Sequence, residues 1–73
     1  MNNLKTYRVK SKLTQKQLAE LTNISAPRVT QLERCLNQPS LKTAQRIIAA
    51  LNFSGAKCSI NDVFPPEDIK QVS

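Results

Sequence analysis

The segment from Thr14 to Glu33 constrains the fold of this chain more than any other part of its sequence. It reads TQKQLAELTNISAPRVTQLE, and its apolar residues recur at spacings that bring two helical faces together. These apolar residues are Leu18, Leu21, Ile24, Val29 and Leu32. The pattern predicts two short helices held at a fixed angle by a tight turn.

Polar residues mark where these two helices begin and where the turn lies. Thr14 and Ser25 carry side-chain oxygens that can accept hydrogen bonds from the free amides of a helix start. Asn23 lies between them, and asparagine tolerates the positive φ that such a turn often needs. Pro27 fits the first turn of the second helix, because an amide there has no intrahelical acceptor. The arrangement is a helix-turn-helix, which commonly places its second helix in the major groove of DNA.

The rest of the chain reads as further short helices, and the fold class predicted is all-α with four to five helices. The clearest 3.6-residue period follows Pro39 and Ser40 and places Leu41, Ala44, Ile47, Ile48 and Leu51 on one face. The expected helices cover residues 3–11, 14 or 15 to 21, 25 or 26 to 34 and 41–51. Loops are expected at 36–38 and 53–57. A short helix or turn should run from Ser59 or Asn61 to Phe64, and a last turn at 67–72 should follow Pro65 and Pro66.

Positive charge is concentrated on the half of the chain that contains the helix-turn-helix. The 73 residues carry a net charge of +6. Residues 1–46 hold nine Lys or Arg against two Glu, whereas residues 47–73 hold two Lys against three acids. Such an excess is compatible with an ordinary solvated surface, but its distribution favours a surface that faces phosphates. We expect no membrane-spanning segment, because no stretch approaches about 20 apolar residues. We expect no binding to a membrane surface, because no helix pairs a large apolar outer face with a basic one.

The sequence offers nothing for catalysis. It has no histidine, a single glycine and scattered acidic residues, so we expect neither an enzyme nor a cofactor. Cys35 and Cys58 are too far apart for a zinc site without histidine, and we expect both to be reduced. The first ten residues, MNNLKTYRVK, lack the apolar segment of a signal peptide, which favours a cytoplasmic protein.

From about Leu4 to Leu51 the chain resembles the helix-turn-helix family of phage repressors and Cro proteins, the XRE and Cro-repressor type. The stretches LTQKQLAELTNIS, VTQLER and QPSLKTAQRIIAALN carry the resemblance in the family's order and spacing. Two positions depart from it, because Asn23 and Cys35 stand where the family commonly has glycine. The resemblance implies a lambda-repressor-like DNA-binding bundle, with a double-stranded DNA operator as partner and a bacterial cell as host.

In such a motif the first residues of the second helix meet base edges. The resemblance places Ala26, Pro27 and Gln31 at base-contacting positions. Ala26 and Pro27 offer only apolar contact, for instance with a thymine methyl group. Arg28 and Gln31 are therefore the expected polar base readers, and Arg28 has phosphate contact as an alternative.

Contacts to the DNA backbone are expected at two helix N-termini, where free amides and the helix dipole favour an anion. Gln15 matches a glutamine that bonds phosphate in the family, and the start of the fourth helix is a second place for phosphate. The expected set is Gln15, Lys16, Thr30, Asn37, Ser40 and Lys42. The resemblance also pairs Arg8 with Glu33 as a structural salt bridge.

We interpret residues 1–73 as a single helix-turn-helix domain, with residues 1–51 as the family-like core and 52–73 as a C-terminal association segment. The apolar residues assigned to association are Phe53, Ile60, Val63, Phe64, Ile69 and Val72. The expected function is sequence-specific regulation of transcription by a homodimer, as a Cro-like protein or repressor of a phage, prophage or mobile element. The weakly polar tip of the second helix leaves open an antirepressor that binds a partner repressor, and an antitoxin has the same fold.

Overall fold

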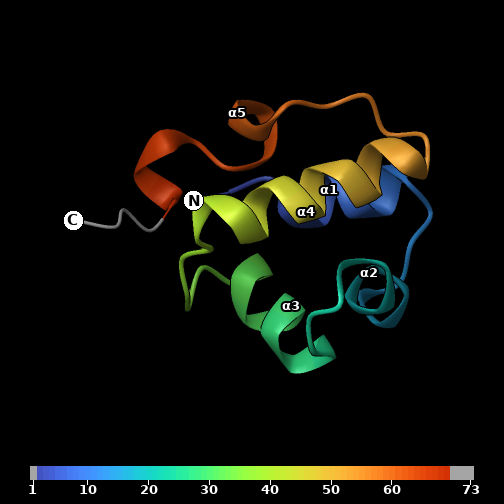
Figure 1. Ribbon diagram of the computed structural model, residues 1–73, viewed down its shortest axis with the longest axis horizontal. Coiled ribbons are helices and arrows are strands. Elements are labelled where there is room, and N and C mark those ends of the chain that lie inside the picture. Colours follow the sequence, from blue (N-terminus) through green and yellow to red (C-terminus); the bar gives the residue numbers. More distant parts are fainter. Residues whose placement is uncertain (1, 70–73) are drawn as a thin grey trace.

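The computed structural model describes residues 2–69, which fold into helices without a strand (Figure 1). The all-α class and the helix-turn-helix are therefore confirmed. Val72 and the end of the predicted last turn lie outside the described residues. The elements are α1 (Leu4–Lys10), α2 (Gln15–Thr22), α3 (Ala26–Glu33), α4 (Leu41–Phe53), α5 (Ile60–Val63) and a 3-10 turn, η1 (Pro66–Asp68).

Hydroxyl side chains begin three of the helices, as the sequence predicts. Thr14 Oγ1 accepts from the backbone N–H of Gln17 at 3.0 Å, and Gln17 Oε1 accepts from the N–H of Thr14 at 2.9 Å. This reciprocal capping box satisfies two amides that the helix leaves without partners. Ser25 caps α3 and Ser40 caps α4 in the same way, each through the amide three residues later.

The two positions that depart from the family's glycines both have positive φ. Asn23 ends α2 in the left-handed conformation with φ 59°, and Cys35 follows α3 with the same φ. Positive φ is unfavourable for most residues other than glycine, and asparagine tolerates it best. Both positions thus adopt a backbone conformation that glycine accommodates most easily.

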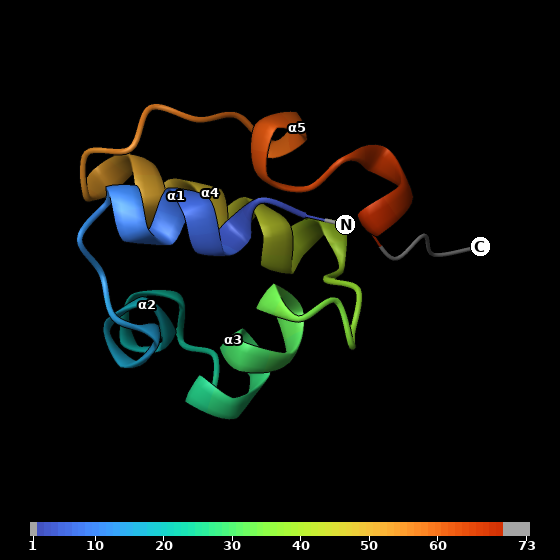
Figure 2. The ribbon, with the colours of Figure 1, turned by 180° about the vertical axis from the view of Figure 1, so that it is seen from behind.

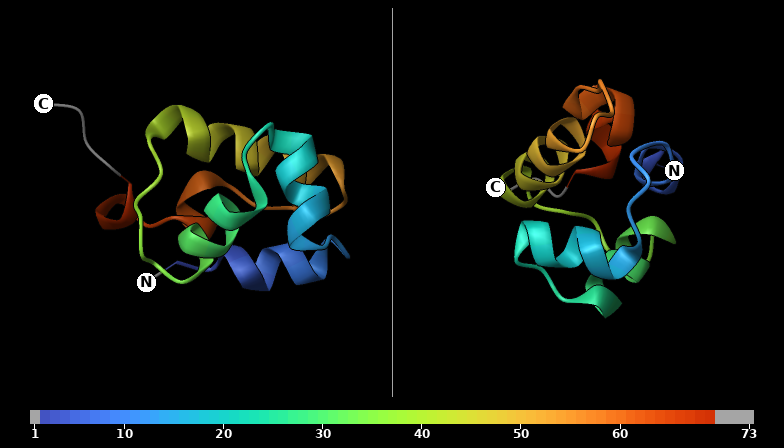
Figure 3. Two further views of the ribbon diagram at one scale, coloured as in Figure 1. Left: turned by 90° about the horizontal axis from the view of Figure 1, so that it is seen from below. Right: turned by 90° about the vertical axis from the view of Figure 1, so that its right-hand side faces the viewer.

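Helices α1 and α4 occupy the middle level of the fold, with α2 and α3 on one side of it and α5 on the other (Figure 3). On one side α2 packs against α3 and α4, and on the other α5 packs on α4 (Figures 1 and 2). The largest side chains buried between these elements are Leu4, Leu18, Val29, Leu32, Ile47, Leu51, Val63 and Phe64. Removing this apolar surface from water is the main force that holds the short helices together.

The assignment of Val63 and Phe64 to association is wrong. Both side chains are 0% exposed, because α5 folds back over α4 and is bonded to Asn3. The backbone N–H of Asn3 donates to the carbonyl of Val63 at 2.8 Å, and Asn3 Nδ2 donates to the carbonyl of Asp62 at 3.0 Å. The hydrophobic core therefore extends past Leu51 and is completed by α5.

Helix α4 is two residues longer than predicted, and the side chain of Asn52 explains how the following loop is fixed. Asn52 Oδ1 accepts from the backbone N–H of Cys58 at 3.0 Å, and its Nδ2 donates to the carbonyl of Cys58 at 2.9 Å. Gly55 adopts φ 104° within this loop. The two bonds to Asn52 hold the backbone of Cys58 against the last turn of α4.

Candidate nucleic-acid interface

Helix α3 is held by one face and leaves the other to solvent. Val29 and Leu32 are fully buried in the core, and their helical spacing fixes the rotation of α3 about its axis. Pro27, Arg28 and Gln31 are consequently exposed, whereas Ala26 is half-buried. The predicted base-contacting positions thus lie on or beside one solvent-facing stripe of α3, at the edge of the molecule farthest from α5 (Figure 1).

Arg34 extends this stripe and was missed by sequence reasoning. It follows the last residue of α3 as its C-cap and is exposed. Its position three residues after Gln31 places it near Gln31 on the helix surface. Its spacing from Gln31 and its positive charge are both visible in the sequence, whereas the family resemblance concerns the start of the helix.

The structure joins a predicted base reader to a predicted backbone contact. Asn37 Nδ2 donates a hydrogen bond to Gln31 Oε1 at 2.6 Å. The bond leaves both hydrogens of the Gln31 amide nitrogen directed elsewhere, so the side chain can still donate to a base edge. Both residues are exposed, and water competes with such a bond in the free protein.

A surface hollow next to α3 gathers several of the predicted contacts. Arg28 lines it from α3, Asn37 from the connecting loop and Ser40 from the start of α4. The exposed thiol of Cys35 lies in the same hollow and accepts a long hydrogen bond from Asn2 Nδ2 at 3.6 Å. Residues from three consecutive elements therefore meet at one place on the surface.

Cys58 and the charged contacts Lys16 and Lys42 lie elsewhere. Cys58 is a free thiol, as is Cys35. Burial raises the pKa of Cys58, and the carboxylate of Asp62 is a second cause.

Lys16 is exposed beside Ser25 and Ala26 along a hollow between α2 and α3. Lys42 is exposed in the first turn of α4. The two lysines thus lie on different helices, and Lys16 is the one beside the start of α3.

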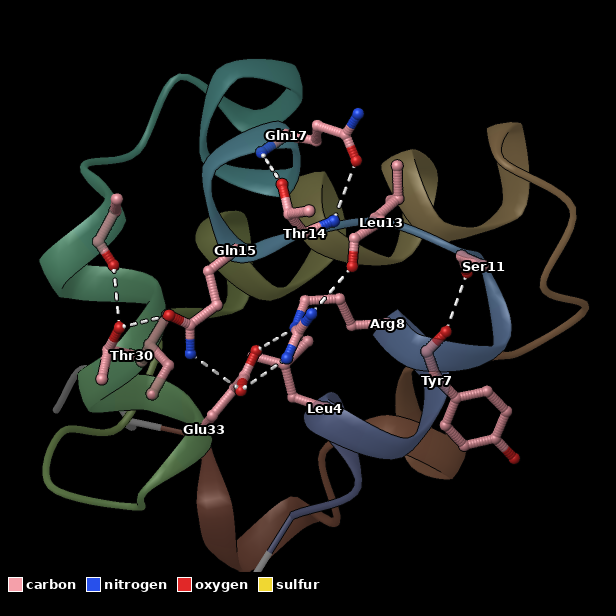
Figure 4. Close-up of polar contacts among 12 residues, drawn as sticks. Leu4, Tyr7, Arg8, Ser11, Leu13, Thr14, Gln15, Gln17, Thr30 and Glu33 are labelled. Carbon is pink, nitrogen blue, oxygen red and sulfur yellow. Dashed lines mark hydrogen bonds and ion pairs between the residues drawn. The ribbon is translucent and has the colours of Figure 1, made fainter.

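Arg8 and Glu33 form the predicted salt bridge between α1 and the end of α3 (Figure 4). Arg8 Nε lies 2.5 Å from Glu33 Oε2, and Arg8 Nη1 donates to the carbonyl of Leu13 at 2.7 Å. The side chains are only 12% and 4% exposed. An ion pair with so little water around it depends on both partners, because either charge alone would be left buried.

Gln15 and Thr30, both predicted to contact the DNA backbone, contact each other (Figure 4). Thr30 Oγ1 donates to Gln15 Oε1 at 2.9 Å, and Gln15 Nε2 donates to Glu33 Oε1 at 3.2 Å. A polar chain therefore runs from α1 through Glu33 to the first residue of α2. It fixes the two helices of the motif relative to each other, in addition to their apolar contacts.

The remaining association residues do not gather in one patch. Phe53 is 85% exposed at the end of α4, whereas Ile60 and Ile69 are half-buried against the core. The end of α4 and η1, which precedes Ile69, lie at opposite ends of the molecule (Figure 1). Phe53 instead lines a hollow with Leu21 and Arg46, between the ends of α2 and α4.

Comparison with known proteins agrees with this geometry. A family model described as helix-turn-helix matches residues 4–57, which begin with the first residue of α1 and include the whole of α2, the turn, α3 and α4. A comparison with curated proteins found no match. Within residues 2–69 no helix is long and apolar enough to cross a membrane.

Proposed function

Because the chain belongs to the XRE and Cro-repressor type of the helix-turn-helix family, a family of DNA-binding transcription regulators, we propose that it is a sequence-specific, Cro-like repressor of a phage, prophage or other mobile element. The observation that carries the proposal is the exposed stripe of α3. Val29 and Leu32 fill the core, so Arg28 and Gln31 face outward from the helix that enters the major groove in such proteins.

The chemistry of the stripe suits base edges. An arginine can donate two hydrogen bonds to guanine, and a glutamine can bond adenine through both its amide atoms. Asn37 accounts for one lone pair of Gln31 Oε1, and the second lone pair and the amide hydrogens remain for a base. Ala26 and Pro27 contribute apolar surface at the tip of the helix.

Phosphate contacts position this stripe without reading sequence. Gln15 begins α2 and Ser40 caps α4, so the two helix N-termini approach the DNA backbone on either side of α3. Lys16, Lys42 and Asn37 add charge and hydrogen-bond donors near these ends. A protein bound in this way acts in the cytoplasm of its bacterial host, where the operator lies.

We further propose that the protein acts as a homodimer through the surface around Phe53. The Phe53 side chain is 85% exposed, and Leu21 beside it is 48% exposed. Two large apolar side chains that are exposed next to each other indicate a contact surface. Two recognition helices that are linked in a dimer bind half-sites about one helical turn apart much more tightly than separate monomers. Sedimentation should therefore show a Phe53→Ser variant with less dimer than the wild type, whereas Leu36→Ser, at another exposed leucine, should leave the dimer intact.

The proposal is tested by a gel-shift assay at controlled salt with duplex DNA from around the gene's own promoter. We expect a discrete complex that survives an excess of random duplex. If an equal mass of random duplex abolished the complex with the promoter DNA, the result would contradict sequence-specific regulation.

An antirepressor is the second candidate, and the apolar tip of α3 favours it. Ala26 and Pro27 cannot form side-chain hydrogen bonds, and Leu36, beyond the other end of α3, is 65% exposed. Such a surface suits a protein partner. The same gel-shift assay, run with and without a repressor encoded next to the gene, separates the two candidates, because an antirepressor would release the repressor's complex and form none of its own.

A further inference from the structure

Thr30 has an intramolecular partner that accounts for its hydroxyl hydrogen. Its Oγ1 lies 2.9 Å from Gln15 Oε1 and 3.3 Å from the carbonyl oxygen of Ala26. A hydroxyl group has one hydrogen to donate, and the shorter distance is the better hydrogen bond. Thr30, which is half-buried, therefore holds the oxygen of the Gln15 amide against α3.

Glu33 determines which way round this amide lies. Gln15 Nε2 is 3.2 Å from Glu33 Oε1. Glu33 forms the ion pair with Arg8, and the oxygens of a carboxylate only accept hydrogen bonds. Turning the amide over would place Gln15 Oε1 against that carboxylate, with no hydrogen between two acceptors. The amide is thus fixed at both ends, by Thr30 through its oxygen and by Glu33 through its nitrogen.

The arrangement leaves one definite group for a ligand. The amide nitrogen of Gln15 carries two hydrogens, of which Glu33 takes one. The other has no partner within residues 2–69. Gln15 is the first residue of α2, where the helix dipole and free amides favour an anion.

We infer that Thr30 is a positioning residue for DNA binding, which holds Gln15 so that its remaining amide N–H is directed to a DNA phosphate, and that Thr30 does not contact DNA itself. The inference rests on the proposed function, because it assumes the phosphate contact of Gln15. A side chain that is already fixed loses less freedom on binding, so the contact is stronger than the same contact from a mobile glutamine.

The test is a double-mutant cycle on a random-sequence duplex, since phosphate contacts do not depend on sequence. Thr30→Val removes the hydroxyl and keeps the shape of the side chain, and it should weaken binding about threefold to tenfold. Thr30→Ser should restore binding. Thr6→Val, at an exposed threonine of α1, is the matched control and should bind like the wild type.

In the Gln15→Ala background, Thr30→Val should have no further effect, because its role passes through Gln15. Additive losses would show that Thr30 touches DNA directly and would overturn the inference. Wild-type affinity in the single Thr30→Val variant would overturn it as well.

A measurement on the free protein separates this inference from the proposed function. NMR relaxation of the Gln15 side-chain amide should show a rigid group in the wild type and a mobile one in Thr30→Val. The two proteins should have the same thermal stability. An amide that is equally mobile in both proteins overturns the inference, whatever the DNA result. A rigid amide in a wild-type protein that binds no duplex would instead contradict the proposed function.

Discussion

The backbone N–H of Asn3 donates to the carbonyl of Val63 at 2.8 Å, so the residue directly before α1 is attached to α5. The side chains of Val63 and Phe64 lie in the core beside this bond with no exposed surface. The C-terminal third of the described chain is therefore part of the folded unit that carries α3.

A truncation that ends at residue 57 should consequently unfold. It removes Val63 and Phe64, and loss of a buried phenylalanine alone costs about 3–5 kcal/mol, comparable to the total stability of roughly 4–11 kcal/mol for a chain of this length. Circular dichroism of the truncated chain should show little helix at about 25 °C. The full chain is the reference, and a cooperative melt of the shorter chain would show that α5 is dispensable.

Removing Arg8 should destabilise the fold far more than removing an exposed lysine. Arg8→Ala leaves the carboxylate of Glu33 buried and unpaired, at a cost of about 3 kcal/mol. The control is Lys5→Ala, which should cost under about 1 kcal/mol because Lys5 is exposed. Lys10 and Lys12 are less suitable controls, since Lys10 packs over the Tyr7 ring and Lys12 has φ 59°. Chemical denaturation measures both, and equal midpoints would mean that the ion pair contributes little.

Cys35→Gly should stabilise the protein by about 0.5 kcal/mol, or about 3 °C in Tm, because glycine adopts φ 59° without steric cost. Cys35→Ala removes the same thiol but keeps a Cβ, so it should give no such gain. Thermal melts of the two variants decide the matter. Equal stabilities would attribute the effect to the thiol and not to the backbone.

Local features of this fold were predictable because they depend on neighbouring residues. The caps at Thr14, Ser25 and Ser40 and the left-handed turn at Asn23 involve residues within three or four positions, which the sequence displays directly. The same holds for the exposed stripe of α3, whose buried face follows from the spacing of Val29 and Leu32.

Long-range relations were not predictable in this way. An apolar pair such as Val63 and Phe64 has the same composition whether it meets a second protein or its own core, and only the path of the loop after α4 decides between them. The contact of Thr30 with Gln15 joins residues 15 positions apart. It depends on how α2 and α3 are rotated against each other, which helical periodicity alone does not determine.

Binding to DNA should weaken steeply with salt, because basic side chains displace counterions condensed on the duplex. With roughly 4 to 6 phosphate contacts per monomer, log affinity should fall with log salt at a slope of about −0.9 for each contact. Titrations of one duplex at several salt concentrations measure the slope. A nearly flat dependence would favour a protein partner over DNA.

The most direct test of the account is the effect of Gln31→Ala on two duplexes, the preferred site and a random sequence. If the exposed stripe of α3 reads bases, the variant should lose about 1–3 kcal/mol on the preferred site and almost nothing on the random one. Gln45→Ala, at an exposed glutamine of α4, should change neither affinity. Equal losses on both duplexes for Gln31→Ala would contradict the claim that α3 reads the operator.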